Sequence, residues 1–179
     1  MKALNRHPTC KVYTHVLRDA ADWAEPPFDG AQYVVLLALT EGRPDDAVLG
    51  QTAKNLIETG CRCVNIWGED CWRIWEVVNQ QARTHDQESE HRSSDFVLIK
   101  GLEEAPAREV AEQFLLSSDF DEQVFANFLI LFCGRDAQSE EELTKALREE
   151  LSDGEEFYRS LSPELQRKYN EIHQRGSQL

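Results

Sequence analysis

The sequence lacks any apolar run close to the roughly 20 residues that a helix needs to cross a bilayer. Its opening residues, MKALNRHPTCKVYTH, also lack the apolar core of a secretory signal. These two absences predict a cytoplasmic protein that makes no contact with a membrane.

Cysteines are few and are not spaced for metal binding. The five positions, Cys10, Cys61, Cys63, Cys71 and Cys133, are an odd number without a CxxC pair, and no His-Cys cluster has the spacing of a zinc site. Reduced thiols in a reducing compartment are therefore expected. The sequence predicts no structural zinc and no other metal.

Glycine-rich phosphate loops are absent as well. Neither GxGxxG nor a P-loop occurs, and the segment TEGRPDD, which follows the longest apolar run, carries one glycine and three carboxylates. Carboxylates repel phosphate, so dinucleotide and ATP binding at this turn are disfavoured. No cofactor is predicted.

Basic residues are the minority, and the imbalance is uneven along the chain. The net charge is −14, and between Gly101 and Glu156 there are 16 acidic and 4 basic residues, which gives 4 − 16 = −12. Direct nucleic-acid binding is disfavoured because it needs clustered Lys and Arg. Two interpretations stay open for the acidic third: attraction to a basic protein, or a solvated surface that keeps the protein soluble.

What the sequence does contain is an alternation of apolar strands and amphipathic helices. The run Tyr33–Thr40, YVVLLALT, is continuous and predicts a strand buried on both faces. Further strands are expected at 61–67, 95–99 and 128–133, each followed by a helix. The prediction is a three-layer α/β domain with a mainly parallel sheet of four or five strands, helices on both faces, a Rossmann-like or flavodoxin-like order with Tyr33–Thr40 at its centre, and a C-terminal helix.

The two ends of the chain are less regular. Residues 1–30 are interpreted as an N-terminal arm in which Lys11–Leu17 is either a short edge strand or a helical turn. Residues 31–152 form the α/β domain, whose last main helix is expected to end at Asp153-Gly154. Residues 153–179 form a helical appendage that packs on the same domain, or docks on a partner, through a helix at about 163–173.

Carboxylates follow the predicted strands, where open parallel sheets bind ligands. Glu41, Glu69 and Asp70 are therefore the alternative catalytic residues of a metal-dependent phosphodiester enzyme or a small-ligand enzyme. The segment ALTEGRPDDAVL resembles the first motif of the Toprim fold, although the Asp-x-Asp pair of that family is missing. Cys71 is expected to be a packed thiol, and Trp67, Trp72 and Trp75 are expected to pack the core more often than to line a pocket.

The leading hypothesis is a non-enzymatic protein that binds a basic protein partner. The predicted binding residues are the clustered acids, which face outward if Leu143, Leu147 and Leu151 face the core: Asp119, Asp121, Glu122, Glu140, Glu141, Glu142, Glu149 and Glu150. Acidic surfaces steer association with basic partners and set its specificity. An immunity, antitoxin or other defence-associated role in a bacterium fits this chemistry.

Three segments carry a wider resemblance. PPFDG, TGCRCVNIWGEDCWRIWEV and DFVLIKGLEE together resemble an uncharacterised family of small acidic bacterial α/β proteins that has no assigned function, over about residues 25 to 135. The resemblance implies the α/β fold and supplies no active residues.

Overall fold

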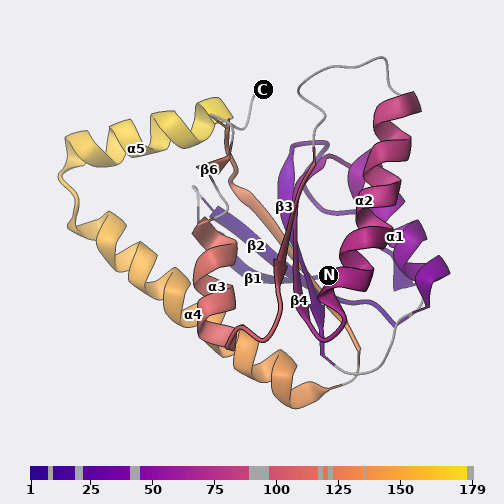
Figure 1. Cartoon of the computed structure of the whole chain (residues 1–179). Helices are drawn as coiled ribbons and strands as arrows, with labels where there is room; N and C mark the ends of the chain where they lie inside the picture. The colour runs from indigo at the N-terminus through magenta and orange to yellow at the C-terminus, as the bar shows by residue number, and fades with distance from the viewer. Residues whose placement is uncertain are drawn as a thin grey trace.

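Strand β3 (Tyr33–Leu39) forms the middle of the fold, and all seven of its residues are buried. It pairs in parallel with β4 on one side and with β8 on the other. A strand buried on both faces needs a layer of helices on each side of the sheet, and Figure 1 shows both layers. The computed structural model describes residues 1–7, 10–18, 22–40, 45–88, 97–116, 119–120, 123–134 and 136–176.

The main sheet has six strands in the order β1-β2-β8-β3-β4-β5. Five of them run parallel, and β1 joins the edge antiparallel to β2. A separate two-stranded ribbon of β6 and β7 precedes β8 in the chain. The bounds of these strands are β1 (Lys2–His7), β2 (Cys10–Val16), β4 (Cys61–Gly68), β5 (Leu98–Leu102), β6 (Asp119–Phe120), β7 (Gln123–Val124) and β8 (Asn127–Cys133).

Two helices cover each face of the sheet. α1 (Asp46–Glu58) and α2 (Cys71–Glu88) pack on one face, and α3 (Ala107–Leu116) and α4 (Ala137–Ser160) pack on the other (Figure 1). Because side chains alternate along a strand, β3 supplies both cores with apolar groups. A last helix, α5 (Pro163–Gly176), turns back against the end of α4, where the rings of Tyr158 and Tyr169 lie 5.6 Å apart.

The α/β class is confirmed, and the predicted count of four or five strands is too low. Residues 1–30, interpreted as an arm, contribute β1 and β2 to the sheet. Most of Lys11–Leu17 lies in β2, so the strand alternative is correct, but β2 lies between β1 and β8 and the edge strand is β1. Most residues of β2 are only half-buried. A half-buried strand has no continuous apolar run, and for this reason the pattern was too weak to predict it.

Several predicted boundaries also differ from the structure. A strand is predicted at 95–99, of which residues 95 and 96 lie outside the described residues, and β5 spans Leu98–Leu102. α2 continues past Arg83 to Glu88. α4 passes through Asp153-Gly154 and ends at Ser160. Glycine in a helix interior costs only about 1 kcal/mol relative to alanine, which the tertiary packing of a long helix readily outweighs.

Candidate functional site

The carboxyl ends of β3 and β4 carry the residues that the sequence offers for catalysis. Glu69 is exposed directly after β4, and Asp70, which is half-buried, has a φ of 61°. Glu41 lies outside the described residues. Gly68 has a φ of 111°, and a Cβ on it would lie 2.3 Å from the main-chain oxygen of Leu39, so the two strand ends approach each other too closely for a side chain at this position.

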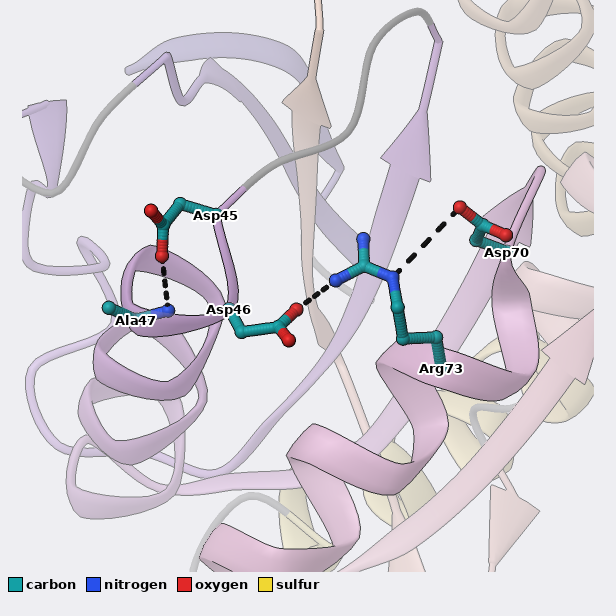
Figure 2. Close-up of polar contacts among 5 residues, drawn as sticks. All are labelled: Asp45, Asp46, Ala47, Asp70 and Arg73. Carbon is teal, nitrogen blue, oxygen red and sulfur yellow. Dashed lines mark hydrogen bonds and ion pairs between the residues drawn. The ribbon is translucent and has the colours of Figure 1, made fainter.

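Arg73 engages the carboxylates at these strand ends. Its guanidinium forms an ion pair with Asp46 in the first turn of α1 and lies 3.9 Å from the carboxylate of Asp70 (Figure 2). Asp45, the residue before α1, accepts a hydrogen bond from the main-chain N–H of Ala47 at 2.7 Å and so caps that helix. The arrangement joins the starts of α1 and α2.

Asp70 is therefore held by a cation of the protein itself, while Glu69 points into solvent. Within the described residues no three His, Cys, Asp or Glu side chains lie close enough together to hold a metal ion. Of the predicted catalytic carboxylates Glu69 and Asp70, which are neighbours in the chain, Asp70 is the one that lies beside Arg73.

Cys71 is a packed thiol, as its place on the apolar stripe of α2 predicts. It is buried, and its Sγ donates to the main-chain oxygens of Gly68 at 2.9 Å and Ile66 at 3.3 Å. Burial raises the pKa of the Cys71 thiol above its ordinary value, and main-chain hydrogen bonds offset part of that effect. A thiol in this state is a poor nucleophile.

The three neighbouring tryptophans have three different environments. Trp67 packs on the α3–α4 core, and its Nε1 donates to the main-chain oxygen of Ala105 at 2.8 Å. Trp75 packs on the α1–α2 core. Trp72 is 68% exposed, as its position off the apolar stripe of α2 indicates, whereas the general expectation that the three tryptophans pack the core is correct only for Trp67 and Trp75.

The predicted acidic surface lies along α4. Leu143 and Leu147 are fully buried and Leu151 packs at the edge of the core, so the helix faces the sheet in the predicted orientation. Asp136 caps the helix by accepting main-chain hydrogen bonds from Gln138 and Ser139 at 3.0 and 3.3 Å.

The five predicted glutamates of α4 fall into two groups. Glu141, Glu142 and Glu149 are exposed, whereas Glu140 and Glu150 are half-buried. Three of these glutamates contact neighbouring side chains of the same layer. Glu149 lies 3.9 Å from Lys145, and Glu150 lies 3.8 Å from Arg108 of α3. Glu142 accepts a hydrogen bond from Gln138 at 2.9 Å.

The second predicted acidic cluster, Asp119, Asp121 and Glu122, is not seen to join the acidic surface of α4. Asp119 begins β6, and the position of its side chain is not described, while Asp121 and Glu122 lie outside the described residues.

Further acids lie on the same layer, and of these Glu156, together with Glu155, is expected from the sequence to extend the acidic cluster of α4. Glu109 and Glu112 are exposed on α3, and Asp153 and Glu156 are exposed on the second half of α4. The apolar stripe of α3, with Val110 and Phe114 buried, was a signal that could have placed Glu109 and Glu112 on the outside. We call the exposed acids of this layer the α3–α4 acidic surface; they are Glu109, Glu112, Glu141, Glu142, Glu149, Asp153 and Glu156.

Comparison with known proteins assigns a family. The family model described as a domain of unknown function, DUF7684, matches residues 12–150. The chain belongs to the DUF7684 family. The match runs from β2 into α4 and leaves α5 outside it. The predicted membership of an uncharacterised family is thereby confirmed, and no curated protein matches the chain. Within the described part of this DUF7684 protein, no helix has the length and apolar character that crossing a bilayer requires.

Proposed function

We propose that this DUF7684 protein is a non-enzymatic interaction protein whose α3–α4 acidic surface binds a basic protein partner in the bacterial cytoplasm. The observation that carries the proposal is the charge of two packed helices. α3 and α4 together hold 10 acidic and 4 basic residues, or 4 − 10 = −6. A surface with a net negative charge raises the rate of encounter with a positively charged partner and disfavours partners of like charge.

The ion pairs on this layer support that proposal because they are weak and local. The pair of Lys145 and Glu149 is highly exposed, with 76% and 62% of the two side chains accessible. Exposed pairs of this kind contribute only about 0 to 1 kcal/mol and can be exchanged for contacts with a partner. Glu141, Asp153 and Glu156 make no ion pair within the described residues.

An immunity or antitoxin role is the form of this function that we favour. Such proteins neutralise a basic toxin or cover a nucleic-acid-binding groove, and in both cases a rigid acidic surface is the binding element. The buried residues Leu143 and Leu147 anchor the first half of α4 to the core and so fix the backbone that carries Glu141, Glu142 and Glu149. Preorganised charges lose less entropy on binding than mobile ones.

The alternative, a metal-dependent or small-ligand enzyme at the strand ends, has weaker support. The order β5-β4-β3-β8, which is 3-2-1-4 counted from β3, favours the Rossmann-like arrangement and a crevice at the carboxyl ends of β3 and β8. However, Asp70 is paired with Arg73, and among the described residues no three His, Cys, Asp or Glu side chains gather to hold a metal ion.

The test is a charge-matched comparison. The variant E141Q/E142Q/E149Q removes three exposed acids of the acidic surface, and the control E25Q/D29N/E58Q removes three exposed acids elsewhere. Each protein is used to capture partners from source-cell lysate at low and moderate salt, and the partners are identified by mass spectrometry. We expect a basic protein to bind the wild type and the control at low salt and to be released by salt.

We expect the same protein to be absent from the capture by E141Q/E142Q/E149Q. Equal recovery by all three proteins, or a partner that moderate salt does not release, would contradict the proposal. Circular dichroism of both variants checks that the fold is retained, and exposed Glu-to-Gln changes are expected to alter stability by less than about 0.5 kcal/mol.

A further inference from the structure

Strand β5 is the outermost strand on one side of the main sheet in the part of the chain that the structure describes. It is the last strand of the order β1-β2-β8-β3-β4-β5, and in the described part of the chain it pairs with β4 alone. Leu98, Ile99 and Lys100 are half-buried and Gly101 is exposed. An unpaired strand edge presents a row of main-chain N–H and C=O groups that can hydrogen-bond with an added strand.

The flank of α2 on this side of the sheet is not covered by α1. α1 contacts the opposite flank, where Arg73 pairs with Asp46. On the same flank, a Cβ placed on Gly50 of α1 would lie 3.7 Å from Nε2 of Gln81 and 4.0 Å from Cγ1 of Val77. Helical periodicity places Trp72, Trp75 and Asn79 on the other flank. That flank of α2 lies toward the β5 edge of the sheet.

Trp72 is the most exposed large apolar side chain of the described residues. Its ring meets the ring of Trp75 edge-on, with the centroids 6.3 Å apart. An open groove of about 470 Å³ continues from Trp75 along the same helix, lined by Trp75, Glu76, Asn79, Gln80, Arg83 and Thr84. An exposed tryptophan beside a groove has the composition of a binding hot spot, because a large rigid ring gains much contact area for little lost entropy.

Acidic groups surround the tryptophan end of this region. Glu76 follows Trp72 by one helical turn, Glu69 precedes it, and Glu103 and Glu104 follow β5; all four are exposed. The basic residues of β5 and of the groove are Lys100, which is half-buried, and Arg83, which lies two turns beyond Trp75. The carboxyl end of β5 therefore offers a tryptophan ring among four carboxylates, which is complementary to an arginine or lysine side chain.

We propose that the outer edge of β5 and the ring of Trp72 form a docking site for an extended basic segment of a partner protein. The segment adds to β5 as a further strand, and one of its arginine or lysine side chains packs on Trp72 between Glu69 and Glu76. This inference depends on the proposed function in one respect only, which is that the partner is positively charged. It is formed by α2 and β5 and uses no residue of the α3–α4 acidic surface.

The experiment uses a displayed library of random ten-residue peptides, selected on the full chain. We expect the enriched peptides to alternate β-branched residues with arginine or lysine. Binding to Trp72→Ala should be weaker by at least about tenfold, as for a hot-spot residue. Phe157→Ala is the matched control because Phe157, on α4, is 61% exposed, and it should bind like the wild type.

Two further measurements separate strand addition from simple attraction. Amide exchange of residues 98–102 should slow when an enriched peptide is bound, and a proline in the middle of that peptide should abolish binding, because proline lacks the N–H that a ladder needs. The proposal is overturned if no peptide is enriched, if Trp72→Ala binds equally well, if β5 is not protected, or if the proline peptide still binds.

The same peptides distinguish the two proposals. E141Q/E142Q/E149Q should bind them as the wild type does, since it leaves β5 and Trp72 unchanged. A loss of peptide binding in that variant would overturn the β5 site as an independent surface, whereas a failure of the lysate experiment alone would leave the peptide result standing.

Discussion

Arg73 of α2 forms an ion pair with Asp46 of α1, 27 residues earlier in the chain (Figure 2). The guanidinium also lies near Asp70, so one cation links the first turn of α1, the turn before α2, and α2 itself. This link sets the spacing of the two helices at the carboxyl ends of β3 and β4, where an enzyme of this architecture would place its site.

Replacing Arg73 should therefore weaken the fold measurably. Arg73 is 26% exposed and pairs with two carboxylates, so we expect Arg73→Met to lower the free energy of unfolding by about 1 kcal/mol or slightly more. The control, Lys54→Met, breaks the pair with Glu58 in which both side chains are more than half exposed, and should cost less than about 0.5 kcal/mol. Urea unfolding followed by tryptophan fluorescence measures both values, and equal losses would contradict the linking role.

Two glycine substitutions should have opposite effects. Gly68→Ala introduces a Cβ at 2.3 Å from the Leu39 oxygen and a side chain at a φ of 111°, so we expect a loss of about 2 to 3 kcal/mol. Gly154→Ala lies inside α4 with open space around it and should raise stability by about 0.5 to 1 kcal/mol. Thermal unfolding of the two variants provides the comparison, and a stabilising Gly68→Ala would show that the turn after β4 is not constrained.

Asp136 should make stability depend on pH at the acid end. The Ser139 hydroxyl and the Gln138 N–H donate to its carboxylate and hold the pKa of Asp136 below its ordinary value. A lowered folded-state pKa contributes stability above the unfolded-state pKa, and that stability is lost as the pH falls through the folded-state value.

The stability difference between the wild type and Asp136→Asn should then shrink as the pH falls below about 4. Asparagine still caps a helix, so this variant isolates the charge from the cap itself. Ser139→Ala removes the donor that lowers the pKa most, and it should weaken the pH dependence. A difference between wild type and Asp136→Asn that stays constant with pH would contradict the assignment.

The thiols should be protected in the native protein. Burial raises the pKa of Cys10 and of Cys133 to about 12, and it raises the pKa of Cys61 further still. The thiolate is the reactive form, so a disulfide reagent at mildly alkaline pH should modify these thiols slowly in the folded chain and all five cysteines rapidly in urea. Fast modification of Cys61 or Cys133 without unfolding would contradict the buried assignment.

Much of the fold could be predicted because its central strands carry unbroken apolar runs. β3 and β8 are buried along their whole length, and no other element pattern explains such runs between polar turns. β1 is the edge strand, and β2, between β1 and β8, is largely half-buried, so β2 lacks the continuous apolar run that makes β3 and β8 predictable. The end of α4 was misplaced because Asp153-Gly154 has the composition of a stop signal, while the packing of the helix continues beyond it.

The candidate sites divide in the same way. The outward direction of Glu141, Glu142 and Glu149 follows from the spacing of Leu143 and Leu147. The pairing of Arg73 with Asp46 does not follow from the sequence, since it depends on α1 and α2 lying side by side. The exposure of Trp72 likewise depends on which flank of α2 is covered by α1.

Periodicity and composition alone determined that this chain is an acidic α/β protein with a central strand at Tyr33–Leu39 and an acidic outer face on α4, because these properties depend on residues close together in the chain. Tertiary structure alone decided the strand order, in which β1 and β5 are the outermost strands of the described sheet. Those features depend on pairings between segments far apart in the sequence, and local propensity carries no information about which distant partner a strand selects.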